Sequence, residues 1–166
     1  MDNEPRKDSC PETLIRNLLD IASKGGNFLL NAGPTNLGEF PQESVDILQK
    51  MGQWMKINGE AVYGTNVSPW GLFSWGRCTR KAIKDNTVLY FSVFEWPADG
   101  KLVIPELKNK VVSALLLADG TKLKTSASIE NTTIVLPSKA PDPIATVIKI
   151  TVRGKIVVTP VLETKK

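Results

Sequence analysis

Histidine is absent from the 166-residue sequence, and cysteine is nearly so. Without imidazole, the chain has no Ser-His or Cys-His catalytic pair and no zinc site that requires a histidine ligand. The two cysteines, Cys10 and Cys78, lie far apart and form neither a disulfide framework nor a metal-ligand motif. We therefore expect no metal ion and no cofactor.

Long apolar runs are also lacking. No stretch approaches the roughly 20 apolar residues that a membrane-spanning helix needs, so we expect no membrane span. Residues 1–11 are polar and charged, without the apolar segment of a secretory signal. We predict that they form a disordered lead-in.

The positive charge of the chain is not concentrated. The net charge is +4 and the 21 basic residues are scattered, apart from a short run at residues 77–81. Nucleic-acid binding requires a contiguous basic surface with stacking aromatic side chains. We expect no nucleic-acid partner.

What the sequence does contain is clearest at residues 23–37. An unbroken apolar run at residues 28–30 stands between two glycine-containing breaks, which predicts a strand covered on both faces, as in an α/β layer. Asn31 follows at the carboxyl end of that strand, where α/β barrels carry their active sites. It is a candidate substrate-binding residue, and the alternative is that its amide shapes the following turn. Glu39, in the loop beyond, is a second candidate, on the rim of a pocket.

Two amphipathic segments flank the predicted strand. Pro11 suits the first turn of a helix that ends at Gly25 and Gly26. A second helix is predicted over residues 41–58, with a broad apolar stripe. One strand cannot cover that stripe, so we expect this helix face either to self-associate or to dock on the rest of the chain.

From about residue 73 the apolar period changes to two. Seven or eight short strands at roughly ten-residue spacing predict an antiparallel β-sandwich. They include two three-residue strands, at residues 122–124 and 156–158. The boundary between the two parts falls near Thr65. Trp70, beside proline and glycine in a loop, is the tryptophan we expect to be exposed and able to stack on a sugar, whereas Trp75 and Trp96 are expected in a core or interface.

Several motifs in fixed order resemble retaining α-L-fucosidases, bacterial members in particular. Ser23 to Pro34 and the segment up to Thr65 resemble the last strand and helix of the catalytic barrel. Three further segments resemble the C-terminal β-domain of that family. They are residues 75–79, 96–102 and 116–120. Together the similar segments cover nearly all of residues 12–160.

The resemblance implies an α+β chain in which a partial (β/α) barrel remnant, helix-strand-helix, precedes an antiparallel β-sandwich. Its parts would be a lead-in at residues 1–11, a barrel fragment at residues 12–64 and a sandwich domain at residues 65–166. A whole barrel needs about 250 residues, so the chain resembles only the tail of the enzyme.

The same resemblance implies that both catalytic carboxylates lie upstream, so that no catalytic residue is expected here and the fragment is predicted to be inactive. The intact enzyme would act on fucosylated glycans and be periplasmic or secreted. The alternative function is an autonomous carbohydrate-binding β-sandwich.

Overall fold

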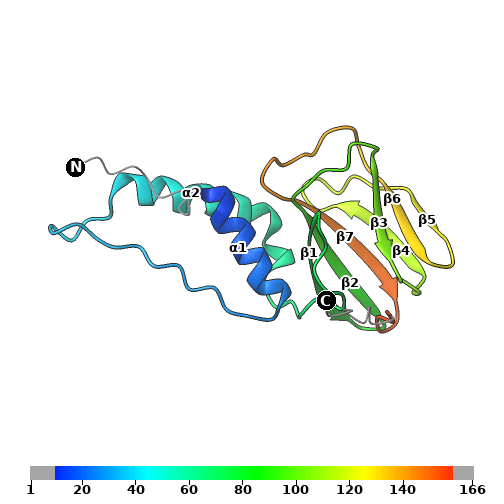
Figure 1. Cartoon of the computed structure of the whole chain (residues 1–166). Coiled ribbons are helices and arrows are strands. Elements are labelled where there is room, and N and C mark those ends of the chain that lie inside the picture. Colours follow the sequence, from blue (N-terminus) through cyan, green and yellow to red (C-terminus); the bar gives the residue numbers. More distant parts are fainter. Residues whose placement is uncertain (1–9, 159–166) are drawn as a thin grey trace, which may run out of the picture.

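A computed structural model describes residues 10–158, so most of the predicted lead-in lies outside the described residues. Two helices lie side by side at one end of the molecule and two β-sheets at the other (Figure 1). This arrangement confirms the predicted fold class, in which a helical part precedes an antiparallel β-sandwich. None of the described helices has the length and apolarity to cross a membrane.

Both predicted helices are present. Helix α1 (Pro11–Ser23) has its proline in the first turn, and the Cys10 thiol accepts a hydrogen bond from the Thr13 N–H. The helix stops before Gly25, whose φ of +78° is a backbone conformation that glycine adopts at low cost. Helix α2 (Gln42–Asn58) continues into a single 3-10 turn, η2 (Gly59–Ala61).

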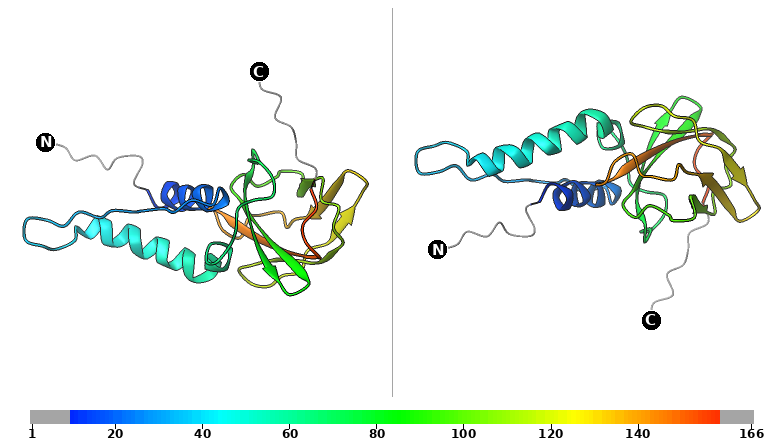
Figure 2. Two further views of the ribbon diagram at one scale, coloured as in Figure 1. Left: turned by 90° about the horizontal axis from the view of Figure 1, so that it is seen from below. Right: turned by 90° about the horizontal axis from the view of Figure 1, so that it is seen from above.

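The strand predicted at residues 28–32 does not form. Between α1 and α2 the chain runs as an extended segment without strand pairing, out to a loop that lies far from the sheets in both turned views (Figure 2). A strand needs a neighbour to bond its backbone N–H and C=O groups, and the described residues offer none there. The local apolar pattern is therefore that of a strand, but the described residues supply no strand that pairs with it.

Within residues 10–158, seven strands make two antiparallel sheets. The larger sheet has the order β1-β2-β7-β4 and the smaller has the order β3-β6-β5. Their bounds are β1 (Gly76–Ile83), β2 (Asn86–Val93), β3 (Lys101–Pro105), β4 (Val111–Leu116), β5 (Thr125–Ala127), β6 (Asn131–Val135) and β7 (Thr146–Arg153).

Two of the short predicted strands were wrong. Residues 122–124 touch β4 by one isolated bridge, and the strand begins only at Thr125. Residues 156–158 form no ladder, because the Val157 N–H is bound by the side chain of Asn109 instead of by a neighbouring strand.

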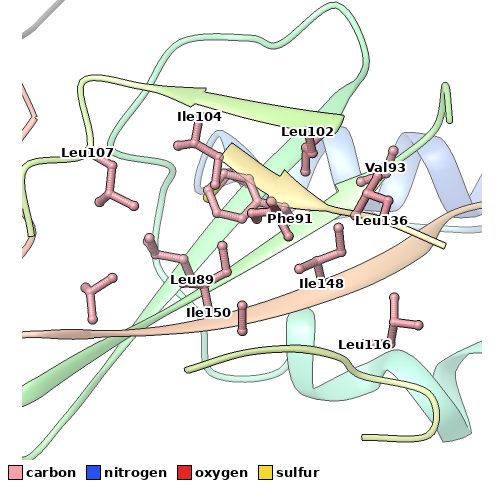
Figure 3. Packing of buried hydrophobic residues seen from close by; sticks show 14 residues of the cluster. Leu89, Phe91, Val93, Leu102, Ile104, Leu107, Leu116, Leu136, Ile148 and Ile150 are labelled. Atoms are coloured by element: carbon pink, nitrogen blue, oxygen red, sulfur yellow. The ribbon is translucent and has the colours of Figure 1, made fainter. Parts of the chain in front are cut away.

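Strand β2 is the centre of the molecule, since it is buried on both faces. Its inward side chains, Leu89, Phe91 and Val93, meet the smaller sheet in the main core (Figure 3). Its outward side chains, Val88 and Tyr90, are covered by the two helices. The result is three layers, in which the helices, the larger sheet and the smaller sheet follow one another.

The stripe of α2 docks on this outer face only in part. Met51 and Trp54 are buried against the sheet, and the Trp54 indole N–H donates to the Ala145 carbonyl at 3.2 Å. Leu48, nearer the start of the helix, remains exposed. The C-terminal half of α2 thus docks on the sandwich, which was one of the two expectations for this helix.

Candidate functional site

The extended segment between the helices is the first candidate site. Among the described residues, none forms a backbone hydrogen bond with residues 27–34. Phe28 and Leu30 turn partly inward onto the helical core, whereas the side chain of Leu29 is 91% exposed. An apolar side chain and a row of unpaired peptide groups on one exposed segment are the features of an open strand edge.

A shallow cleft of about 150 Å³ lies where this segment passes between the two helices. Asn31 lines it and is itself exposed. The other lining side chains are mostly apolar or small: Leu14, Leu30, Ala32, Gly33, Ser44, Ile47 and Leu48. One amide in an apolar groove can orient a ligand, but no second polar side chain except Ser44 converges on it.

The other two predicted site residues do not join Asn31 in one pocket. Glu39 is exposed in the loop before α2, where its backbone carbonyl accepts a hydrogen bond from the Thr35 N–H. Trp70 packs on the core of the sandwich. The sandwich lies at the opposite end of the molecule from that loop (Figure 1). No single site built from Asn31, Glu39 and Trp70 therefore exists in the described residues, and their roles in binding stay predictions.

Trp70 is less exposed than we predicted. It is half-buried against the main core, where its ring centroid lies 5.7 Å from that of Phe91. Its indole N–H donates to the Pro105 carbonyl at 2.9 Å. The loop of residues 69–71 suggested exposure, but the indole supplies area to the core and its N–H donor is used within the chain.

The partly buried carboxyl groups serve the contact between layers. Asp20 of α1 is ion-paired with Arg77 of β1 and with Lys24. Burial by itself would raise the pKa of Asp20, but the hydrogen bonds and charges of Lys24 and Arg77 outweigh it and lower the pKa below its usual value. Beside this pair, Arg16 donates to the Phe94 and Ile144 carbonyls.

Glu60 is the second such group. Its Oε1 accepts hydrogen bonds from the Tyr90 hydroxyl at 2.8 Å and from Lys149 Nζ at 2.6 Å. Here too burial acts to raise the pKa of Glu60, and the bonds from Lys149 and Tyr90 outweigh it and lower the pKa. The same contact, with burial, raises the pKa of Tyr90. The sequence pattern did not reveal these contacts, because the partners lie 30 to 89 positions apart.

These carboxyl groups are unsuited to general acid catalysis, which needs a carboxyl that holds its proton near neutral pH. Lowered pKa values favour the ionised form. The described residues also contain no cluster of three or more cysteine, aspartate or glutamate side chains able to hold a metal ion. The polar contacts at this face therefore hold the layers together.

Replacing Glu60 by Gln is expected to lower the free energy of unfolding by about 1 kcal/mol at pH 7, the usual size of a partly exposed charged hydrogen bond. A carboxyl whose folded pKa is lowered stabilises the fold above its unfolded pKa of about 4.3, and the effect is lost as pH falls through the folded pKa. Urea unfolding at pH 7 and pH 3 measures the difference between wild type and variant.

The matched control is Glu130→Gln, an exposed residue whose side chain forms no ion pair within the described residues. This change should leave stability nearly unaltered at both pH values. A stability gap for Glu60→Gln that stayed constant down to pH 3 would show that the charge of Glu60 contributes nothing to the layer contact.

Comparisons with known proteins agree on one family. A family model described as alpha-L-fucosidase matches residues 2–60. The alpha-L-fucosidase of Dictyostelium discoideum is 37% identical over 139 residues, which cover 77% of this chain and 29% of that protein. The tissue alpha-L-fucosidase of Rattus norvegicus is 33% identical over 132 residues, covering 77% of this chain and 28% of the relative. This chain thus spans less than a third of these curated relatives.

Solved structures give the same result. Alpha-L-fucosidase isoenzyme 1 from Paenibacillus thiaminolyticus superposes with a TM-score of 0.79 and 32% identity, over 89% of this chain and 36% of that one. An alpha-L-fucosidase from Bacteroides thetaiotaomicron, trapped as a covalent intermediate with 2-fluoro-fucosyl fluoride, gives a TM-score of 0.77 and 29% identity, over 87% of this chain and 32% of the other. The likeness extends through both the helical part and the sandwich.

Proposed function

Because the chain belongs to the alpha-L-fucosidase family, we propose that it is the C-terminal part of an enzyme that hydrolyses alpha-L-fucosyl linkages in glycans. In this proposal, residues 12–64 are the last piece of the catalytic barrel and residues 65–166 are the sandwich that supports it. The chain by itself has a structural role and does not hydrolyse fucosides.

The observation that carries the proposal is the extended segment at residues 27–34. Its backbone has no hydrogen-bond partner among the described residues, and Leu29 is 91% exposed. A strand needs a neighbouring strand to bond its backbone groups, and an unbroken apolar run is typical of a strand that other elements cover on both faces. About two thirds of each solved relative lies outside the part that this chain matches, which is ample to supply those strands.

The carbohydrate-binding alternative finds little support in the tryptophans. A sugar stacks on an indole face that is open to solvent, and all four indoles are buried or half-buried. Three of them donate their N–H to a backbone carbonyl: Trp54 to Ala145, Trp70 to Pro105 and Trp96 to Pro137. The fourth, Trp75, stacks on Phe73 with ring centroids 4.4 Å apart.

Two assays on the purified chain test the proposal. Alone, it should release no product from an aryl alpha-L-fucoside above the buffer rate, because its partly buried carboxylates are held in ion pairs. Co-expressed with the part of the Paenibacillus thiaminolyticus enzyme that lies outside the match, it should restore measurable turnover. Robust turnover by the chain alone would overturn the proposal, as would its failure to associate with the added part.

A charge placed on the open segment sharpens the second assay. Leu29→Glu should leave the thermal midpoint of the isolated chain unchanged, since that side chain is in solvent, and should abolish association. Leu72→Glu is the control, because Leu72 is also exposed, at 60%, but lies in the loop beside the sandwich.

Without the added part, the exposed residues Leu29 and Leu48 at the helical end of the molecule should drive self-association through the helix 41–58 face, which light scattering would detect.

A further inference from the structure

A second cleft, of about 380 Å³, opens at the other end of the molecule, between the edges of the two sheets. One wall is the β3–β4 loop at residues 107–110 with the first residue of β4, Val111, and the other is β5 with the start of β6. The cleft shares no residue with the open segment at residues 27–34, so nothing about it rests on the proposed function.

The wall formed by the β3–β4 loop is rigid. Asn109 donates to the Arg153 and Lys155 carbonyls and accepts from the Val157 N–H, at 2.8 to 2.9 Å. Glu106 has a φ of +57°, an unfavourable value for a residue with a side chain, and its N–H is held by the Glu130 carbonyl. Strain of this kind persists only where surrounding contacts enforce it, and it concentrates at binding sites.

Thr132, at the base of the cleft, has an unused polar group. The residue is only 1% exposed. Within residues 10–158, its buried Oγ1 has no hydrogen-bond partner. An unpaired buried hydroxyl costs about 1–3 kcal/mol, so a group that can bond it gains that amount on binding. Ser128 and Thr125 add two more hydroxyl groups to the lining.

The charge at the cleft is positive. Lys108 and Lys110 line it, and no acidic residue does. Lys108 is engaged by Glu106 at 3.2 Å and by the Ile129 carbonyl, whereas Lys110 forms no ion pair in the part of the chain that the structure describes. Residues 101–158 as a whole carry nine basic and four acidic side chains, which favours an anionic ligand.

Apolar side chains complete the lining, with Leu107, Val111 and Ala127 beside the hydroxyl groups. A mixture of apolar surface, several hydroxyl groups and one free cation suits a ring that carries hydroxyl groups and a single carboxylate. We infer that this cleft binds an acidic monosaccharide unit of the hexuronate type, with its carboxylate on Lys110 and its hydroxyl groups on Thr132 and Ser128.

Titration of the full chain with sodium glucuronate, followed by amide NMR shifts, tests this. We expect saturable shifts confined to residues 107–111 and 125–132. Glucose and sodium acetate are the two reference ligands, since one has the hydroxyl groups without the charge and the other has the charge without the ring. Both should bind more weakly than glucuronate.

Two substitutions report on the cleft itself. Thr132→Val removes the unpaired hydroxyl at nearly constant shape, so the variant should fold at least as stably as wild type while binding weakens. Lys110→Gln should weaken glucuronate binding roughly three- to fivefold, as expected for one exposed charge contact. Lys139→Gln makes the same charge change in the loop before β7 and should have no effect.

The inference is overturned if glucuronate causes no shifts at residues 107–111. It is also overturned if acetate or glucose binds as tightly as glucuronate, because recognition would then not need the acidic sugar. Equal weakening by Lys110→Gln and Lys139→Gln would show a general charge effect and no site.

Discussion

Truncation of Trp54 to alanine should lower the free energy of unfolding by about 3–5 kcal/mol, the range for large buried aromatic side chains. Trp54 is 3% exposed and lies in the cluster where α2 meets Val88, Tyr90 and Val147 of the larger sheet. Its indole also supplies the hydrogen bond to the Ala145 carbonyl. The variant loses apolar area, packing and a donor at one point of the layer contact.

The location of the damage is as informative as its size. We expect the amides of α1 and α2 to lose protection from hydrogen exchange in the Trp54→Ala variant, while those of β3 and β6 keep most of theirs. The reason is that Trp54 belongs to the helix–sheet core, whereas the core between the two sheets is a separate cluster. Mass-spectrometric exchange on peptides from the two regions measures this directly.

Gln53→Ala is the control, since Gln53 is its exposed neighbour on the same helix. It should change stability by less than about 0.5 kcal/mol. Uniform loss of protection across helices and strands in Trp54→Ala would show that the three layers unfold as one unit, which contradicts the separation of the two cores.

The helices and most strands followed from local sequence. Pro11 and Gly25 mark the two ends of α1, and the apolar period of two in β2 identifies its inward residues. These signals are local, because they depend on capping, on glycine conformations and on side-chain alternation within one element. Strands were also predicted at residues 122–124 and 156–158, but a segment of three residues does not show whether a neighbour will pair with it.

The two-sided burial of β2 could be found only in part. Tyr90 and Ser92 on its outer face are polar enough to be taken for a solvent face, but they are buried under the helical layer. The sequence shows the apolar stripe of α2 and the alternating residues of β2. Their pairing is a long-range contact that one sequence does not specify.

The candidate site was predictable to a lesser degree. The glycine-flanked apolar run predicted a strand, which does not form, although the segment is extended and Asn31 lines a cleft beside it. Whether such a segment is paired depends on long-range contacts, so its local pattern could not show that Leu29 is exposed. The cleft at Thr132 left no sequence signal, because a threonine on an inward strand face normally finds a partner.

Phe91→Ala should be the most damaging change in the sandwich, with an expected loss of about 3–5 kcal/mol. Phe91 is fully buried on β2, and its ring lies within 6.0 Å of those of Trp70, Phe73 and Trp75. Those three side chains come from the chain before β1, so Phe91 joins that loop to the core between the sheets. The substitution leaves a cavity, and the surrounding aromatic rings are too rigid to move in and fill it.

Tyr90→Phe is the matched change on the adjacent residue, which faces the helices. It keeps the ring and removes only the hydroxyl bond to Glu60, so we expect a loss of about 1 kcal/mol. Urea unfolding followed by tryptophan fluorescence should show Phe91→Ala shifting the emission of Trp70 and Trp75, which Tyr90→Phe leaves unchanged. If Phe91→Ala cost no more than Tyr90→Phe, the aromatic cluster would be too loosely packed to join the loop to the sandwich, and the loop of residues 65–75 would have to be held by its bridge to β1 at Arg80.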